Sequence, residues 1–165
     1  MDMLPTILDI EASGFGRGSY PIEIGFSDGE GSLFCSLILP EADWTHWDEG
    51  AEALHGISRD LLRSRGRTAR WMAEQLNARL RGQTVYCDGW GHDYTWLARL
   101  YEAVEQRMSF QLDDLRKLLN EDEAGRWRGV TEAVRARQLL TRHRASSDAR
   151  VLQLALGEIK SRVAV

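Results

Sequence analysis

The chain has 165 residues, of which 43% are hydrophobic and 28% are charged. A sequence of this length and composition can bury a sizeable core, which excludes a disordered protein and favours one domain spanning residues 1–165. Its formal net charge of −4 argues against a protein that coats long nucleic acid by electrostatic attraction alone.

The first residues, Met-Asp-Met-Leu-Pro, lack the positive flank and the apolar run of a signal peptide. No stretch approaches the roughly 20 apolar residues of a membrane span. Cys35 and Cys87 lie in strand-like segments without metal-ligand spacing, a pattern typical of buried thiols. We therefore expect a cytoplasmic protein that does not associate with membranes.

The first part of the chain reads as three strands with short connections. Apolar and alternating residues predict strands over 6–11, 20–27 and 32–39, and Asp-Gly-Glu-Gly at 28–31 indicates a hairpin turn. Strands linked in this way favour an antiparallel meander.

After Pro40 the pattern changes to helices that alternate with short strands. Periodicity and end signals predict helices at 48–54, 68–81, 91–107, 113–119 and 130–141, and strands at 84–88 and 109–112. Ser146 or Ser147 is expected to cap a last helix that runs to about residue 163. This order predicts an α/β fold with a mixed sheet.

Two acids interrupt the first predicted strand. Asp9 and Glu11 are two residues apart, so both side chains lie on one face of the strand, and their apolar neighbours favour a central position in the sheet. Two carboxylates at the end of a strand are suited to binding a hard cation through oxygen. The alternative is an edge strand with both acids in water.

Two further acids stand at the head of apolar helical stripes. Asp93 precedes Leu97, Leu100, Tyr101 and Val104 at helical spacing, and Asp148 precedes Leu152, Ala155 and Ile159. Burying an unpaired carboxylate is costly, so a shared metal ion is the expected compensation. The alternative is that both are helix-start acids that favour the macrodipole and face water.

His143 lies five residues before Asp148, in the predicted loop that precedes the last helix. An imidazole with a pKa near 6.5 suits proton abstraction from water at neutral pH, which makes His143 a candidate general base. A solvated loop histidine between two arginines is the alternative.

The order and spacing of these residues resemble the DEDDh 3′–5′ exonucleases, which include oligoribonuclease, ribonuclease T and the proofreading subunit of bacterial DNA polymerase. Three motifs carry the resemblance: residues 7–14 with Asp9 and Glu11, residues 93–97 with leucine four residues after Asp93, and the His-x4-Asp-Ala stretch at 143–149. Two secondary patterns also match, at residues 21–25 and 55–58, so the resemblance extends from about residue 7 to residue 156.

The resemblance implies a ribonuclease H-like mixed five-stranded sheet, antiparallel first and then parallel, flanked by helices. It implies two divalent cations, Mg²⁺ or Mn²⁺, with Asp9, Glu11 and Asp148 at the first, Asp93 at the second and His143 as the base. The substrates would be 3′ ends of single-stranded or short RNA or DNA, and a homodimer is possible by resemblance. The candidates on the substrate side are Ala12, Gly14 and His55, with Trp96 added because it lies one turn from Asp93 and a tryptophan ring can stack on a base.

Several alternatives stay open at this point. His55 also reads as a helix C-terminal histidine favoured by the dipole, and five arginines between residues 59 and 70 either guide phosphates or form a solvated face. Many relatives have asparagine where this chain has Gly89, which leaves the role of the adjacent Asp88 and the choice between RNA and DNA undecided. The rival functions are a proofreading or processing module of a larger assembly and a catalytically silent nucleic-acid-binding protein.

Overall fold

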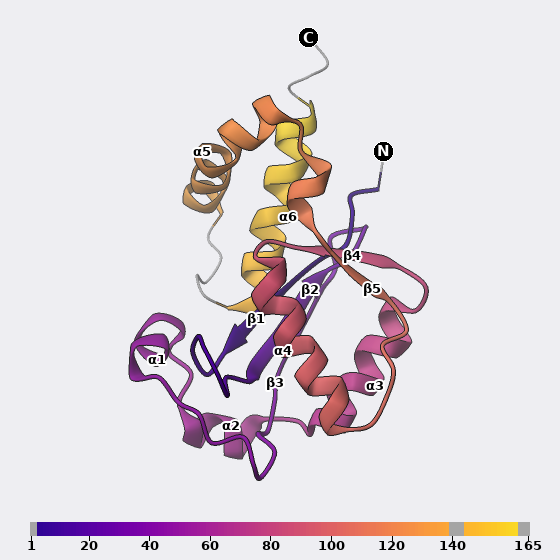
Figure 1. Ribbon diagram of the computed structural model, residues 1–165. Coiled ribbons are helices and arrows are strands. Elements are labelled where there is room, and N and C mark those ends of the chain that lie inside the picture. Colours follow the sequence, from indigo (N-terminus) through magenta and orange to yellow (C-terminus); the bar gives the residue numbers. More distant parts are fainter. Residues whose placement is uncertain (1–2, 139–143, 162–165) are drawn as a thin grey trace.

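A five-stranded mixed sheet forms the centre of the protein, in the order β3-β2-β1-β4-β5. The computed structural model (Figure 1) describes residues 3–138 and 144–161. β1 pairs antiparallel with β2 and β2 with β3, whereas β4 is parallel to both β1 and β5. The strands are β1 (Ile7–Ala12), β2 (Pro21–Ser27), β3 (Leu33–Leu37), β4 (Thr84–Cys87) and β5 (Gln111–Asp114). The predicted fold class is confirmed, and β1 is the central strand.

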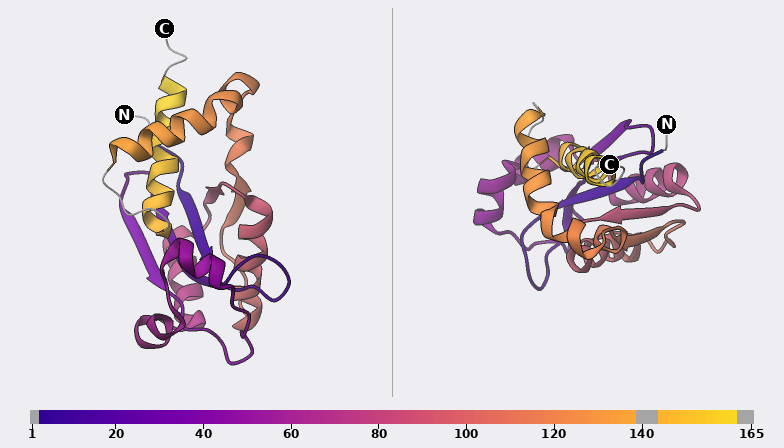
Figure 2. Two further views of the ribbon diagram at one scale, coloured as in Figure 1. Left: turned by 90° about the vertical axis from the view of Figure 1, so that its left-hand side faces the viewer. Right: turned by 90° about the horizontal axis from the view of Figure 1, so that it is seen from above.

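Helices cover both faces of this sheet. They are α1 (Glu49–His55), α2 (Arg59–Arg65), α3 (Ala69–Leu80), α4 (Trp90–Ala103), the 3₁₀ helix η1 (Leu115–Leu118), α5 (Glu121–Arg137) and α6 (Ala145–Ser161). Apolar residues of α3 and α4 share one core with Leu8 and Ile10 of β1, while those of α5 and α6 form a second core with Ile7. Because side chains alternate along a strand, α6 and α4 pack on opposite faces of β1. Figure 2 shows α5 crossing α6 on the outside of the molecule.

Three helical segments differ from the sequence prediction. α5 begins at Glu121, well before the predicted residue 130, because Asn120 and Glu123 form a reciprocal capping box that closes its first turn. The last helix begins at Ala145, so Ser146 and Ser147 lie inside it and neither is its cap. The segment predicted as a helix at 113–119 is divided between β5 and η1.

One helix was missed, and the end of another was predicted wrongly. The basic run after residue 58 contains the short helix α2, which is capped by the Ser58 side chain and buries only Leu62 in the core. Its polar sequence hides the helical period, although serine followed by Asp60 is an N-terminal signal. α4 ends at Ala103 rather than 107, and Glu105 then adopts a positive φ of 53°. Within the described residues, no helix has the length and apolar character needed to cross a membrane.

Candidate active site

β1 presents its two acids on the face that α6 covers. Asp9 and Glu11 alternate with the buried residues Leu8 and Ile10, and they share their face with Ile7 of the α5–α6 core. Both side chains are half-buried. The central position of β1 thus rules out the alternative in which both acids lie on an exposed edge strand.

α6 brings Asp148 to these two acids. One carboxylate oxygen from each of Asp9, Glu11 and Asp148 lies within 4.8 Å of the others, and this is the one such group of potential metal ligands among the described residues. The stripe that Asp148 heads is buried as predicted, with Leu152, Ala155 and Ile159 all in the core. The cluster therefore joins residues that lie up to 139 positions apart in the sequence.

Asp93 approaches from the first turn of α4 and is 4% exposed. Its Oδ2 atom is buried and has no hydrogen-bond partner among the described residues. Burial raises the pKa of Asp93 to about 8; a hydrogen bond from the Cys87 thiol lowers it, and the charge of Asp88 raises it further. The alternative of a solvated helix-start acid is thus wrong for Asp93.

The electrostatics of the cluster favour a bound cation. Burial raises the pKa of Asp9 well above its ordinary value, and the negative charges of Asp93, Glu11 and Asp148 add to the effect. Burial also raises the pKa of Glu11 to about 8, together with the charges of Asp148, Glu23 and Asp93. Carboxylates that repel one another in a poorly hydrated site need a counter-charge, and an all-oxygen donor set fits Mg²⁺ or Mn²⁺.

The remaining acid and base candidates are His143 and Asp88, of which only Asp88 lies among the described residues. His143 lies outside the described residues, so its role as the general base stays a prediction. Asp88 is not part of the cluster among the described residues, and its Oδ1 accepts a hydrogen bond from Arg116 at 3.1 Å and its Oδ2 one from Trp127 at 3.5 Å. The negative charge of Asp88 therefore raises the pKa of Asp93, while both Asp88 carboxylate oxygens accept hydrogen bonds from other residues.

A hollow of about 380 Å³ adjoins the carboxylates. Asp9, Glu11 and Asp93 line it, and so do all four residues that were expected on the substrate side: Ala12, Gly14, His55 and Trp96. Gly14 has a φ of 152°, and a Cβ there would come within 2.6 Å of the Asp48 Cβ atom, so a side chain would displace the turn after β1. Trp96 is buried, and its indole donates to the Ser19 hydroxyl, which fixes the ring where it lines the hollow.

His55 also belongs to this hollow and ends α1 as the sequence indicated. It is buried, its Nδ1 accepts a hydrogen bond from the Ile57 amide, and its ring contacts Trp47. The expected substrate role of His55 is therefore compatible with its position at the end of α1, because the residue that ends the helix also lines the hollow.

The sequence reasoning missed the rim of the hollow. Phe15 and Leu54 are 66% and 65% exposed, although both are large and apolar. The His92 ring stacks on Trp96 at 5.7 Å between centroids, and Phe15 meets His92 edge-on at 5.0 Å. Phe15 follows the first acidic motif directly and His92 precedes Asp93, so proximity to the motifs was the available signal.

The predicted basic run is engaged in local contacts. Arg59 lies over the Trp47 ring and Arg67 over the Trp71 ring, while Arg63 pairs with Asp60 on the surface. None of these arginines lines the hollow beside the carboxylates. The solvated-face interpretation thus describes this run better than a phosphate guide.

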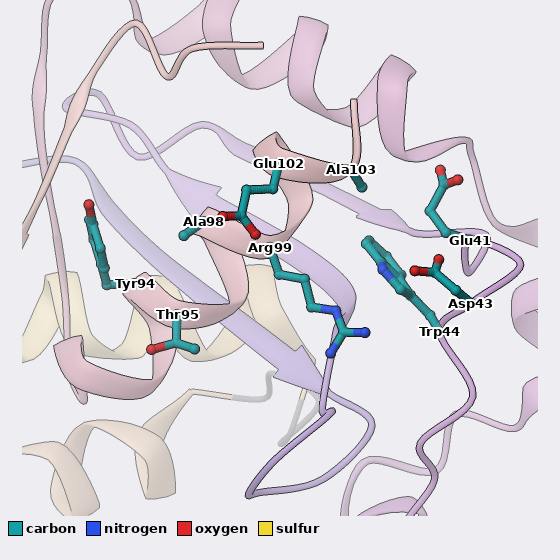
Figure 3. A pocket seen from close by; sticks show the side chains of 9 residues that line it. All are labelled: Glu41, Asp43, Trp44, Tyr94, Thr95, Ala98, Arg99, Glu102 and Ala103. Atoms are coloured by element: carbon teal, nitrogen blue, oxygen red, sulfur yellow. The ribbon is translucent and has the colours of Figure 1, made fainter. Parts of the chain in front are cut away.

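A larger hollow of about 720 Å³ lies between α4 and the loop after β3 (Figure 3). Its rim carries the acids Glu41, Asp43 and Glu102, and the Arg99 side chain points across it while donating to the Ser19 carbonyl. The smaller hollow contains Asp9 and Glu11 of the group of potential metal ligands and the larger one contains none of that group, so the smaller hollow is the better candidate for the substrate.

Solved structures of nucleases share this arrangement of strands and helices. The zinc-bound complex of E. coli exonuclease I with single-stranded DNA aligns with a TM-score of 0.75 at 14% identity, covering 98% of this chain and 41% of that one. Exonuclease I from Methylocaldum szegediense gives 0.69 at 15% identity, with coverages of 97% and 40%. S. pombe Pop2p in its Mg²⁺- and Mn²⁺-bound form gives 0.73 at 15% identity, with coverages of 97% and 84%.

The chain has the ribonuclease H-like fold of these exonucleases. It spans about two fifths of the length of exonuclease I and most of Pop2p. No protein-family model and no curated protein matches the sequence. At these identities the likeness establishes the fold, and the activity has to be argued from the site.

Cation binding is expected to stabilise the protein most at alkaline pH. The pKa of Glu11 is raised from 4.5 to about 8, so between these values the metal-free folded state holds protons that the unfolded state has lost. Stability without metal therefore falls as pH rises through this window, and a cation reverses the loss. At a Mn²⁺ concentration of 100 times Kd we expect a gain of about 2.7 kcal/mol, or roughly 5–10 °C in Tm.

Thermal unfolding at pH 6 and pH 8, each with EDTA or Mn²⁺, measures this effect. Asp148→Asn is the comparison variant, because it removes one carboxylate of the cluster and should abolish most of the rise in Tm. A wild-type Tm that does not respond to Mn²⁺ at pH 8 would contradict cation binding at these residues.

Proposed function

We propose that this chain is a metal-dependent 3′–5′ exonuclease that hydrolyses the terminal phosphodiester of single-stranded or short nucleic acid and releases 5′-mononucleotides. The observation that supports this most strongly is the convergence of Asp9, Glu11 and Asp148 within 4.8 Å, with the buried Asp93 lining the same hollow as Asp9 and Glu11. Four carboxylates at this density are costly without cations, and the residues present suit two of them.

In this proposal the four acids are divided between two cations. Asp9, Glu11 and Asp148 would hold the first cation, and Asp93, whose buried Oδ2 lacks a partner among the described residues, would hold the second. When bound, such cations polarise the phosphodiester and lower the pKa of water. His143 would accept the proton of the attacking water, since its ordinary pKa lies near neutral pH.

The hollow beside the acids supports attack at a chain end. Its volume of about 380 Å³ falls within the range of small-ligand sites, and a terminal nucleotide is a ligand of that class. The exposed Phe15 and Leu54 at its rim are apolar surfaces against which a terminal base can stack. A single strand offers an unpaired end to such a rim, whereas a long duplex does not.

The substrate class follows from the same features. Exonuclease I has been solved in complex with single-stranded DNA, and a site built on the same fold suits a single strand here. The net charge of −4 is offset when two divalent cations bind, so phosphate attraction is concentrated at the site. Short strands are then favoured, because a chain with a negative net charge attracts a long polyanion weakly outside the site.

A processing module of a larger assembly is the second candidate, and one observation favours it. Trp90 and Tyr94 are 39% and 42% exposed and stack on each other at 5.0 Å on the outer side of α4. Exposed aromatic pairs are enriched in protein interfaces. A catalytically silent binding protein is disfavoured, because binding alone does not require a cluster of half-buried carboxylates.

The proposed function is tested with matched 5′-labelled single strands of RNA and DNA in Mg²⁺ or Mn²⁺. The expected result is a ladder that shortens one nucleotide at a time from the 3′ end and disappears in EDTA. Comparing the cleavage rates of the RNA and the DNA strand in one experiment also determines which of the two is preferred. Cleavage that persists in EDTA, or in Asp148→Ala, would refute the metal-dependent mechanism.

Substituting the rim should weaken substrate binding more than turnover. Loss of one stacking surface costs about 1–3 kcal/mol, so Phe15→Ala is expected to raise KM roughly 5- to 150-fold with a smaller change in kcat. Leu33→Ala is the matched control, because Leu33 is 48% exposed on the edge strand β3, outside the hollow. If both variants behave alike in steady-state kinetics, the rim does not contact the substrate.

His143→Ala separates proton transfer from metal binding. A general base contributes about 10²–10⁴-fold, so kcat at pH 7 should fall by that factor while Mn²⁺ affinity stays unchanged. Metal titration of the variant alongside its kinetics checks both parts. A collapse of Mn²⁺ affinity would instead identify His143 as a ligand.

A further inference from the structure

The sheet face that carries Asp9 and Glu11 also carries a third carboxylate, directly beside these two candidate ligands. Glu23 of β2 is the cross-strand partner of Glu11 of β1, and it is fully buried. Cross-strand partners have neighbouring side chains on one face, so Glu23 adds negative charge next to the cluster and raises the pKa of Glu11. A buried acid of this kind needs a partner of its own.

That partner is the beginning of α6. Arg144 donates to Glu23 through both Nε, at 3.0 Å to Oε2, and Nη2, at 2.7 Å to Oε2. The Ala145 amide donates to Glu23 Oε1 at 2.8 Å. One carboxylate thus pairs with the guanidinium and accepts from an amide of the first turn that has no partner within the helix, and hydrogen bonds to a charged acceptor are among the stronger ones.

The same residue connects this contact to the cluster. The Arg144 carbonyl accepts the Asp148 amide at 2.9 Å, so the side chain of Arg144 is bound to Glu23 while its backbone is bound to Asp148. Gly25, the cross-strand partner of Asp9, leaves space that the Ser146 backbone fills. The start of α6 is therefore held over β1 and β2 where Asp148 must meet Asp9 and Glu11.

We propose that Glu23 and Arg144 are positioning residues for the metal site, which place Asp148 and neutralise the excess charge beside Glu11. The role rests on the proposed function, because it assumes that Asp9, Glu11 and Asp148 bind the cation. Glu23 is not a member of the group of potential metal ligands found among the described residues, and a guanidinium does not bind cations. They determine where the ligand Asp148 lies and offset the negative charge beside Glu11.

α6 provides a matched control at its other end. Glu123 is also buried, with 3% of its side chain exposed, and accepts a hydrogen bond from Lys160 at 2.7 Å. Glu23→Gln and Glu123→Gln therefore each remove one buried acid that is paired with a cation at one end of α6 and also accepts a backbone amide, from Ala145 and Asn120 respectively. Only the first pair lies beside Asp148.

The test measures Mn²⁺ affinity, Tm and kcat for the wild type and for Glu23→Gln, Arg144→Gln and Glu123→Gln. Loss of residues that orient metal ligands typically reduces affinity 10- to 100-fold, and we expect this for the first two variants. Their kcat should recover partly at high Mn²⁺. Glu123→Gln should lose a similar amount of Tm but keep Mn²⁺ affinity within about twofold of the wild type.

Arg144→Lys serves as the conservative variant, since the Arg144 side chain is 41% exposed and the change is compatible with folding. It keeps the charge but not the two-pronged contact, so its affinity should be intermediate. Mn²⁺ affinities that are equal in Glu23→Gln, Arg144→Lys and Glu123→Gln would overturn the positioning role. A wild-type protein that does not bind Mn²⁺ would overturn the proposed metal site itself, and with it this role.

Discussion

Asp9→Asn is expected to reduce the exonuclease rate at least 1000-fold, which corresponds to about 4 kcal/mol of lost transition-state stabilisation. Burial raises the pKa of Asp9, and so do the negative charges of Asp93, Glu11 and Asp148. The Asp9 carboxylate thus interacts with every other acid of the site. Asparagine keeps the shape of the side chain but removes the negative charge that a cation needs. Single-turnover cleavage of a labelled strand measures the change.

The same substitution should raise the stability of the metal-free protein, because it removes one of several carboxylates that repel each other. Activity and Tm are thus expected to move in opposite directions, which separates this effect from misfolding. Asp113→Asn is the control: Asp113 lies in the parallel strand β5 and pairs with Lys117, outside the cluster. Wild-type activity in Asp9→Asn would show that the cluster is not the reaction centre.

Gly25→Ala should impair both folding and activity. An added Cβ would lie 2.5 Å from the Ser146 amide nitrogen and 2.9 Å from the Ala145 carbonyl carbon, and backbone atoms cannot rotate away as side chains do. The start of α6 must then move outward and carry Asp148 with it. We expect a loss of about 1–3 kcal/mol in unfolding free energy, together with weaker Mn²⁺ binding.

Gly129→Ala provides the comparison, because Gly129 lies in α5 and a Cβ there would meet nothing within 4 Å. Alanine in the interior of a helix is favoured over glycine by roughly 0.5–1 kcal/mol, so this variant should be at least as stable as the wild type. Denaturant unfolding and Mn²⁺ titration of both variants measure the difference. Equal stability of the two would mean that α6 does not pack closely on Gly25.

The metal-ligand candidates were predictable because local rules expose them. Strand alternation put Asp9 and Glu11 on one face, and an acid at the head of an apolar stripe identified Asp93 and Asp148 before any contact was known. The mixed sheet followed from the order of strand and helix signals. These features depend on the period of the chain, which a single sequence displays.

What the sequence did not reveal depends on contacts between distant segments. The pairing of Glu23 with Arg144 joins residues 121 positions apart, and neither residue type is unusual in its local context. The rim is similar: exposure of Phe15 is decided by how the turn after β1 packs on the loop that carries Asp48. The start of α5 was a missed feature with a local signal, the capping box at Asn120 and Glu123.

The central claim is that carboxylate-bound cations drive cleavage from a free 3′ end. The most direct measurement compares a linear single strand with the same sequence closed into a circle, each incubated with the protein and Mn²⁺. The expected result is conversion of the linear strand to 5′-mononucleotides, no change in the circle, and no cleavage of either in EDTA. Cutting of the circle, or loss of the linear strand without metal, would contradict the claim.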